Sequence, residues 1–417
     1  MTDNLKLHQK LISYLLISIP FLLITGPFLS DLAVVFICIL YLFNNFTNDI
    51  KRYYKNIFFI LFITFYIVCI ISSLFSDYPL ISTFKSISYI RFLIFTLAIV
   101  YILNKNPSII KGFFISIFFC FVILIFDGFY QFIFKKNIFG FIMHENRTSS
   151  FFKDELIYGS YLSKFLPIFL SLFLIQPLKS NKINILFSII FVLSIIAITI
   201  SGERSSLFLT ILILFYLLIM LRLDFKILIS FFLVIFLAIG SMLSFNDTVK
   251  NRIIIFTKNQ IFTENKTFIF SEDHNGHLVS ALDIFKNHNK LIGIGPKNYR
   301  NYCFNNKKYE TKPFVCSSHP HNTYIQMLLE TGILGFVILI IMFCLIFYIS
   351  FKHLYLRLFR KKLMLNNFQI CLISFYVMIL WPVIPTGSFF NNYLSIIYYL
   401  PLGFLIWSKI NIKHFFK

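Results

Sequence analysis

Long apolar stretches separated by short polar segments recur along most of the chain. A stretch of about 20 apolar residues is long enough to cross the hydrocarbon core of a bilayer as an α-helix. Because backbone groups in lipid have to be hydrogen-bonded within the protein, the sequence predicts an all-α polytopic membrane protein, with residues 1–417 forming a single membrane-embedded domain. The twelve predicted spans are 11–29, 30–46, 56–75, 87–103, 109–129, 156–177, 184–200, 205–221, 225–245, 322–350, 366–387 and 391–409.

Lys and Arg residues gather in alternate polar segments, which predicts the orientation of the spans. The short segments assigned to the outside hold only Lys85 and Arg204. Both termini are therefore expected in the cytoplasm. The positive residues assigned to the cytoplasmic side are Lys6, Lys10, Lys51, Arg52, Lys55, Lys105, Lys111, Lys179, Lys182, Arg222, Lys226, Lys352, Arg357, Arg360, Lys361, Lys362, Lys409, Lys413 and Lys417.

Two longer segments, 130–155 and 246–321, fall on the outer side of this topology. The second carries more basic than acidic residues, which suits an anionic partner such as a phosphate or pyrophosphate. A merely solvated basic loop is the alternative. Within it, the apolar positions 278, 281, 282 and 285 share one helical face and predict an amphipathic helix on the membrane or on the bundle, ended by the Gly293–Pro296 turn.

Composition adds one constraint on this outer loop. The chain is 58% hydrophobic and 13% charged, so most of its seven cysteines fall in apolar spans, where a thiol packs as a small apolar group. Cys303 and Cys316 instead share the loop, and an oxidising outer compartment would allow them to form a disulfide. Their spacing does not resemble that of a metal site, and no metal is expected.

The most informative polar segment begins at His319 and leads into the span at 322–350. Asn322 or Thr323 can cap this helix, so His321 lies beside a helix N-terminus, where anions are favoured and imidazolium is disfavoured. A neutral imidazole can accept a proton from a hydroxyl nucleophile. A capping or interfacial histidine without chemistry is the alternative. Gly332 and Gly335, further along, predict a close helix–helix approach.

Two further groups of polar residues flank outer ends of spans. In the turn at 202–206, Arg204 offers a planar fork suited to phosphate oxygens, although an ion pair with Glu203 or a snorkelling side chain would also explain it. In the segment 127–164, Asp127 and Lys164 are charged residues at membrane depth, as is Arg91 in an earlier span. Such residues usually face a cavity, and structural ion pairing is the equal alternative.

These motifs, in this order, resemble the O-antigen ligase family of integral-membrane glycosyltransferases, which includes O-antigen polymerases. The strongest match is the histidine–asparagine pair followed by a helix with an acidic residue and spaced glycines. Supporting matches lie between 127 and 336. The matching segments are His321-Asn322 with Leu328, Glu330, Gly332 and Gly335; Gly202-x-Arg204; Phe285 with Gly293-x-Gly295; and Arg147, Phe152, Glu155 and Gly159.

The resemblance implies transfer of a glycan from undecaprenyl pyrophosphate to a hydroxyl of lipid A–core oligosaccharide, at the periplasmic face of the bacterial inner membrane. It implies no cofactor, nucleotide or metal and no nucleic-acid partner. The implied partners are the membrane lipids, the glycan donor and the acceptor. Three alternatives remain open: an O-antigen polymerase, a transferase that acts on protein hydroxyls, and a flippase for lipid-linked oligosaccharides. A transporter would be expected to show repeat symmetry or paired broken helices, which the sequence does not.

Roles for individual residues also follow from the resemblance. His321 matches the family histidine that activates the acceptor hydroxyl, with Asn322, Glu330, Gly332 and Gly335 in support and His319 as a second candidate base. Arg204 matches an arginine that holds the donor pyrophosphate. The family's second arginine, which usually precedes a Trp in the large loop, is missing from its place. The candidates to replace it are Arg300, Arg252, Arg147 and a histidine such as His277.

Overall fold

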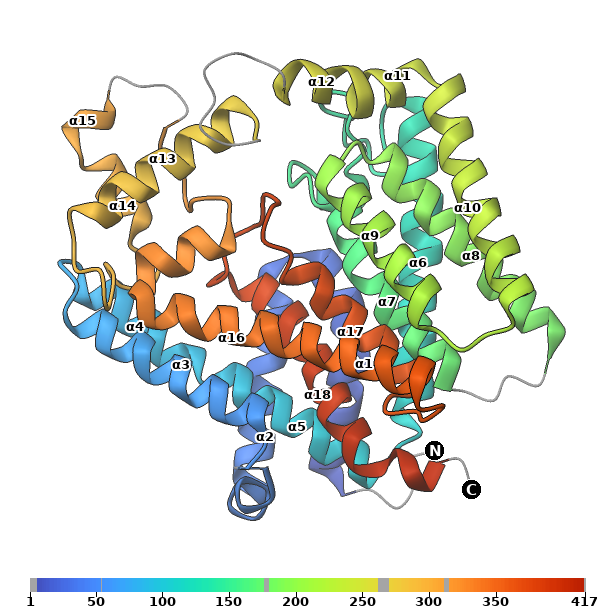
Figure 1. Cartoon of the computed structure of the whole chain (residues 1–417), viewed down its shortest axis with the longest axis horizontal. Helices are drawn as coiled ribbons and strands as arrows, with labels where there is room; N and C mark the ends of the chain where they lie inside the picture. The colour runs from blue at the N-terminus through green and yellow to red at the C-terminus, as the bar shows by residue number, and fades with distance from the viewer. Residues whose placement is uncertain (1–5, 54, 176–179, 262–269, 311–314, 416–417) are drawn as a thin grey trace.

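The computed structural model describes residues 6–53, 55–175, 180–261, 270–310 and 315–415, and the statements below concern these residues (Figure 1). They fold almost entirely into helices, and within the described ranges the extended backbone is limited to isolated bridges at Lys136–Ile142 and His144–Arg147. Lys179 and Lys417, which contribute to the predicted topology, lie outside the described residues, as do 262–269 and 311–314 of the outer loop.

The α-helices follow one another along the whole chain, with one short 3-10 helix and one π-helical turn among them. In chain order the elements are α1 (Leu7–Thr25), α2 (Pro27–Tyr53), α3 (Ile57–Leu74), α4 (Pro79–Tyr89), α5 (Arg91–Lys105), α6 (Ile109–Phe134), η1 (Ser150–Phe152), α7 (Tyr158–Ile175), α8 (Asn181–Ile200), α9 (Arg204–Met220), α10 (Phe225–Phe245), α11 (Asp247–Lys250), η2 (Asn251–Ile255), α12 (Phe256–Ile261), α13 (Glu272–Lys286), α14 (Tyr299–Phe304), α15 (Lys307–Glu310), α16 (Thr323–Phe359), α17 (Asn367–Ile379) and α18 (Asn392–Phe415).

The predicted class, a polytopic α-helical membrane protein, is confirmed. Among the described residues, seven helices are long and apolar enough to cross a membrane, or eight if Ile229–Phe245 and Asp247–Gln260, bent by 95°, form one span. Three shorter apolar helices, at Pro27–Phe43, Arg204–Met220 and Asn367–Ile379, also coincide with predicted spans. Each of the twelve predicted ranges overlaps a helix, but two bounds are wrong: α17 ends at Ile379 within the range 366–387, and the range 11–29 crosses the break between α1 and α2. The number of spans, the periplasmic loop and the single domain remain predictions.

The interior of the bundle is built around α5, which packs against α2 and α18. Nearly every residue from Phe92 to Leu103 is buried, and a helix that is apolar on all sides belongs in such an interior. Aromatic rings fill the space beside it: Phe92 stacks on Tyr399 with ring centroids 5.6 Å apart. This packed body supports the polar segments that emerge at its ends.

The outer segment 246–321 has a small hydrophobic core of its own. The predicted amphipathic helix is present as α13, which buries Ala281 and Ile284 against α14 and α16. The helix lies on the bundle, one of the two placements predicted. Its predicted end is wrong: α13 stops at Lys286 with Asn287 as its C-cap, well before the Gly293–Pro296 turn. That turn has a different role, described below.

Candidate active site

Helix α16 is broken near its beginning. Gly332 adopts a left-handed backbone conformation (φ 66°, ψ −168°), which interrupts the helical hydrogen bonding. The segment 290–295 fills the break: Ile294 N and Gly295 N donate to the carbonyls of Leu329 and Glu330 at 3.0 and 2.9 Å. In the other direction, the N–H groups of the residues that follow the break donate to carbonyls of the same segment. These bonds are Ile333 N to Lys290 O (2.9 Å) and Leu334 N to Leu291 O (3.2 Å).

The glycines at this junction are required by space as well as by conformation. A Cβ on Gly332 would lie 2.2 Å from Leu291 O, and one on Gly293 would lie 2.5 Å from Leu329 O. Gly332 was expected to allow a close helix–helix approach, but its nearest neighbour is the loop. A Cβ on Gly335 would meet the Thr331 side chain of its own helix. Gly332 and Gly293 therefore serve the break in α16 and its contact with the loop.

Glu330 is buried at the same junction and joins three elements. Its carboxylate accepts hydrogen bonds from Gln326 Nε2 (2.9 Å) and from Tyr299 N (3.3 Å), at the start of α14. Its carbonyl accepts from Ser72 Oγ of α3 at 2.8 Å. The acidic residue of the motif is thus a structural residue here: it fixes the first turns of α16 against the outer loop.

The histidine-bearing segment is held at the mouth of α16. Asn322 caps the helix, accepting from Tyr324 N and Ile325 N at 3.0 and 3.1 Å, and its amide donates to Pro382 O. His321 has a left-handed backbone (φ 55°), and its carbonyl accepts from Thr386 N at 2.8 Å. The loop after α17 therefore determines where the His321 ring lies.

Four histidines meet at this point. The His321 ring lies 4.0 Å from that of His319, 5.0 Å from that of His274 and 5.1 Å from that of His277, measured between centroids. His274 and His277 come from successive turns of α13 and thus bring the outer loop onto the α16 mouth. In the sequence the two pairs belong to separate motifs. The sequence did not predict that the docking of α13 brings them together.

Three of these rings are anchored by hydrogen bonds. His319 Nε2 is 3.1 Å from Thr386 O, His277 Nδ1 is 3.1 Å from Val315 O, and His274 Nδ1 is 2.5 Å from Ser271 Oγ. In contrast, no described residue hydrogen-bonds to the imidazole of His321. Its nitrogens are therefore the ones left available to a substrate.

Burial favours the neutral form of His321 and His319. Burial lowers the pKa of His321 below its usual value of 6.5, and the neighbouring imidazoles of His319, His274 and His277 lower it further. Burial also lowers the pKa of His319 to about 4, against the opposing effect of its bond to Thr386. Within the described ranges, no three His, Cys, Asp or Glu side chains are arranged to hold a metal ion.

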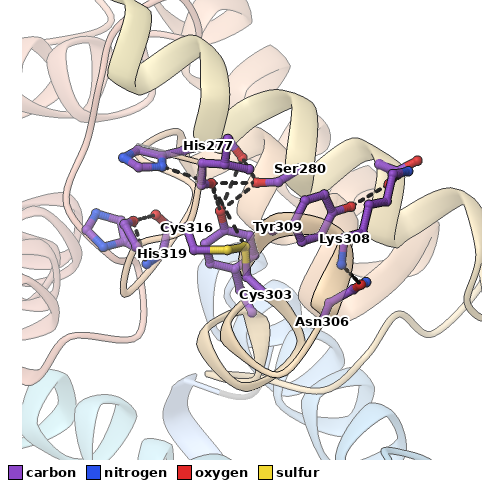
Figure 2. The surroundings of a disulfide bond; sticks show 12 residues. His277, Ser280, Cys303, Asn306, Lys308, Tyr309, Cys316 and His319 are labelled. Carbon is purple, nitrogen blue, oxygen red and sulfur yellow. Dashed lines mark hydrogen bonds and ion pairs between the residues drawn. A yellow bond between two sulfur atoms is a disulfide. The ribbon is translucent and has the colours of Figure 1, made fainter. Parts of the chain in front are cut away.

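A disulfide between Cys303 and Cys316 fixes the segment that leads to His319 and His321 (Figure 2). The neighbouring Val315 carbonyl accepts hydrogen bonds from Ser280 Oγ at 2.9 Å and Tyr299 Oη at 3.2 Å, and faces His277. The bridge and this carbonyl tie α13, α14 and the His319 segment together.

A second polar cluster consists of three arginines around the Gly202 turn. The side chains of Arg147 and Arg252 both lie beside Gly202, where a Cβ would be 3.4 and 3.2 Å from their Cγ atoms. Arg204 and Arg252 share Phe256, with Cζ atoms 5.4 and 4.8 Å from the ring centroid. The bent α10–α12 segment therefore carries Arg252 back to the turn.

Two carboxylates, Glu203 and Glu145, act electrostatically on Arg147 and Arg252, but neither approaches them to ion-pair distance. Arg204 donates to neutral partners, Gln260 Oε1 at 2.7 Å and Thr257 Oγ1 at 3.3 Å. The Nε atoms of Arg147 and Arg252 are buried without a hydrogen-bond partner. Across the described part of the chain, none of the three forms an ion pair with a carboxylate. Three cations in this arrangement can hold an anion with several oxygens.

The expected alternative, an Arg204–Glu203 pair, is wrong. Glu203 turns inward and accepts from Gly159 N (2.6 Å), Ser160 N (2.9 Å) and Ser206 Oγ (2.9 Å). Burial raises the pKa of this carboxyl, which shows how far it is removed from solvent. Glu203 therefore joins α7 to the turn and leaves Arg204 unpaired.

The other predicted residues lie outside both clusters. Arg300 sits on α14 with its Cζ 6.0 Å from the Phe304 ring, and among the described residues no hydrogen bond, ion pair or ring contact joins it to the arginines or the histidines. Asp127 is buried and accepts from Ser150 Oγ at 2.5 Å and Ile138 N at 3.0 Å, so it holds the 130–155 segment in place. It forms no ion pair among the described residues.

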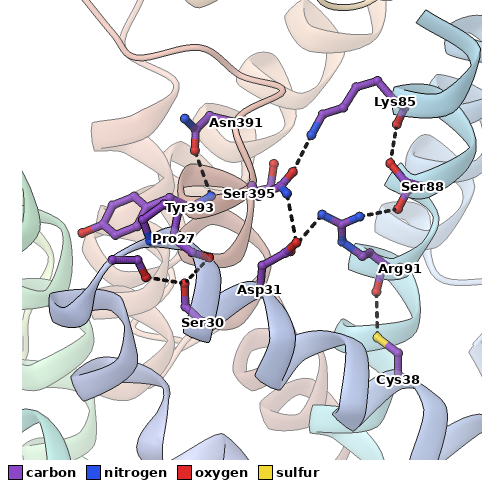
Figure 3. A network of polar contacts seen from close by, with 12 residues as sticks. Pro27, Ser30, Asp31, Cys38, Lys85, Ser88, Arg91, Asn391, Tyr393 and Ser395 are labelled. Carbon is purple, nitrogen blue, oxygen red and sulfur yellow. Dashed lines mark hydrogen bonds and ion pairs between the residues drawn. The ribbon is translucent and has the colours of Figure 1, made fainter. Parts of the chain in front are cut away.

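Arg91 fits the structural alternative (Figure 3). Its guanidinium pairs with Asp31 Oδ1 at 2.8 Å, and the second oxygen of Asp31 accepts from the Asn392 amide at 3.0 Å. Lys85 donates to the same Asn392 side chain. Lys164 likewise contacts Ser160 on its own helix. Arg91 and Lys85 therefore hold helices together, whereas the contact of Lys164 lies within α7.

The fold and the two clusters define a polytopic membrane protein with a group of three arginines and a group of four histidines on its loops. Residues 189–340 match the family model described as O-antigen ligase, a segment that contains Arg204, Arg252 and His321. This match confirms the family that the motifs indicated. The match covers about a third of the chain and indicates a membrane glycosyltransferase of the ligase or polymerase type. No curated protein matches the chain.

Proposed function

We propose that the protein is an O-antigen ligase that moves a glycan from undecaprenyl pyrophosphate to a hydroxyl of lipid A–core oligosaccharide. The proposed reaction takes place at the periplasmic face of the inner membrane, with both termini in the cytoplasm. Residues 1–417 act as one membrane-embedded unit in this proposal, and the outer segment 246–321 supplies part of the site.

The observation that carries the proposal is the group of Arg147, Arg204 and Arg252 without a carboxylate partner. A pyrophosphate has enough oxygens to accept from several guanidinium groups, and its charge would neutralise theirs. As the sugar leaves, negative charge grows on the pyrophosphate, and arginines already in place stabilise that charge without reorganisation. Arg252 or Arg147 thus takes the place of the family's second arginine, which this chain lacks at the usual position.

The acceptor hydroxyl is activated by His321 in this proposal. Its imidazole is neutral and has no hydrogen-bond partner among the described residues, so it can accept the hydroxyl proton as the oxygen attacks the anomeric carbon. The attacked carbon carries the pyrophosphate, which brings negative charge close to the ring. That charge raises the pKa of His321 in the donor complex, toward the range in which a base works well near neutral pH.

The test is deletion of the gene followed by gel analysis of lipopolysaccharide. A ligase is supported if long glycan on the core is lost while carrier-linked polymer accumulates. A single repeat unit that remains attached to the core would identify a polymerase instead. Unaltered lipopolysaccharide together with loss of glycan from proteins would identify a transferase acting on protein hydroxyls.

A further inference from the structure

A cavity of the described structure lies at the far end of α16 from the histidines. Helix α16 crosses the molecule, and His321 precedes its first residue while Arg357 lies in its last turn (Figure 1). The cavity there has a volume of about 690 Å³ and lies between the end of α9, the end of α16 and the beginning of α17. Neither cluster of the candidate active site takes part in it.

Two arginines give this cavity its charge. Arg357 is fixed, because its Nη1 donates to the carbonyls of Ile219 and Met220 at 2.9 and 3.0 Å. Arg222 is fixed through its backbone: its N–H donates to Asn367 Oδ1 at 3.1 Å, and its carbonyl accepts from Asn367 Nδ2 at 3.2 Å. The Arg222 side chain is exposed at the rim, and no described carboxylate forms an ion pair with it.

The acidic residue of the lining, Asp224, forms a hydrogen bond within its own segment. Its carboxylate caps α10 by accepting from Lys226 N at 2.9 Å. The segment after α16 adds Arg360, Lys361 and Lys362 nearby in sequence. Asp224 keeps its negative charge while it caps α10, so the two arginines of the lining outnumber its one carboxylate.

The remaining lining consists of two polar residues, Asn366 and Asn367, and an apolar wall formed by Leu174, Leu223, Leu363, Leu365 and Phe368. Cationic groups beside an apolar wall match an amphiphile, in which a charged headgroup continues into hydrocarbon. Basic pockets between membrane helices on the cytoplasmic side are suited to anionic lipid headgroups. An inorganic anion would use the arginines but leave the apolar wall in contact with water.

We propose that this cavity binds the phosphodiester headgroup of an anionic phospholipid, with Arg222 and Arg357 contacting the phosphate oxygens. Arg222 is the recognition residue, because its guanidinium is free to meet a ligand. Arg357 holds the end of α9 with one nitrogen and presents the others to the cavity. Under the proposed topology the bound lipid belongs to the cytoplasmic leaflet, away from the transfer reaction.

The experiment uses the full-length protein, purified in a neutral detergent, and native mass spectrometry with added phosphatidylglycerol or phosphatidylcholine. We expect the wild-type protein to retain phosphatidylglycerol in preference to phosphatidylcholine. Arg222→Gln should weaken this retention by about tenfold, as expected for one lost charge-assisted contact. Arg360→Gln, an exposed charge of the same region outside the lining, is the matched control and should bind as the wild type does.

Three results would overturn the proposal. Equal retention of both lipids by the wild-type protein would remove the site even if Arg222→Gln failed to fold. Equal phosphatidylglycerol binding by Arg222→Gln and Arg360→Gln would show that charge at this end acts without a pocket. Displacement of the lipid by millimolar inorganic phosphate would show that the cavity recognises free phosphate and not a lipid.

Discussion

At the scale of single residues, the two clusters differ in how their side chains are held. The histidines around His321 are fixed by hydrogen bonds to backbone and hydroxyl groups, which leaves one ring available. The arginines around Gly202 are fixed by an aromatic ring and neutral side chains, which leaves their charge available. Each cluster thus retains one chemical capacity, proton acceptance or anion binding, that internal contacts do not use.

His321→Ala should reduce glycan transfer by at least about a hundredfold, since general base catalysis typically contributes that much. Protein level and membrane insertion should be unchanged, because none of the described residues hydrogen-bonds to the ring. The measurement is the amount of long glycan on core, with His144→Ala as control. His144 is an exposed histidine that contacts Asp154. Normal transfer by His321→Ala would remove His321 from the role of base.

The pH dependence of transfer should report the two environments of His321. Burial lowers its pKa in the free enzyme, so the imidazole stays neutral as the pH falls through 6.5. The acidic limb of kcat/KM should therefore lie well below pH 6.5. A bound pyrophosphate raises the pKa of His321, so the limb of kcat should lie at higher pH than that of kcat/KM. Coincident limbs would contradict a base that faces the pyrophosphate.

Arginine-to-lysine substitutions should identify the second pyrophosphate contact. Lysine keeps the charge but loses the planar fork, so Arg204→Lys and Arg252→Lys should each weaken donor use by about tenfold or more. Arg300→Lys should act like the wild type, because Arg300 lies on α14 beside Phe304. Donor use can be followed as a rise in KM for the lipid-linked glycan. A loss confined to Arg300→Lys would reverse the assignment.

At the scale of elements, the break in α16 is the joint on which the site depends. The segment 290–295 replaces the missing helical partners on both sides of Gly332, and Glu330 adds side-chain bonds at the same place. The first turns of α16, with His321 at their mouth, are thus docked on the outer loop and continuous with the bundle. Movement of that loop would move the histidines.

Gly332→Ala should destabilise the protein by at least about 1–3 kcal/mol, because alanine is strained at φ 66° and its Cβ would collide with the Leu291 carbonyl. Gly240→Ala is the control, since Gly240 lies in helix α10 and a Cβ there meets nothing within 4 Å. Thermal unfolding in detergent measures both variants. Similar unfolding temperatures for the two would show that the junction tolerates a side chain.

Reduction of the Cys303–Cys316 bridge should lower the stability of the outer loop and, with it, transfer activity. A disulfide that closes a loop of this size, with a separation of 13 residues, typically contributes about 3 kcal/mol. Cys303→Ser should reproduce the effect of a reductant, whereas Cys120→Ser, which alters a thiol within the bundle, should not. Unfolding temperature with and without reductant is the measurement. Full activity after reduction would show that Val315 and its partners hold the segment unaided.

At the scale of the whole molecule, the apolar periodicity predicts where helices lie but not where they break. Every predicted span overlaps a helix, since long apolar runs have few alternatives in lipid, although α17 ends at Ile379, well before the predicted end at 387. The role of Gly332 is not predictable from spacing, because its reason is a contact with Leu291, distant in sequence. Arg252 and Arg147 reach Arg204, and His274 reaches His321, for the same reason: a bent or docked segment joins them across the fold.

The proposed orientation of the chain makes a prediction for the molecule as a whole. Cysteines introduced at Arg360 and at His144 lie at exposed positions, one after α16 and one in the 130–155 segment. If both termini are cytoplasmic, a membrane-impermeant thiol reagent added to spheroplasts should label the second position and spare the first until the membrane is opened. A reporter fused after Lys417 should agree with the first position. Labelling of Arg360→Cys from outside would invert the topology, and a periplasmic His321 and a cytoplasmic lipid cavity would then both have to be exchanged.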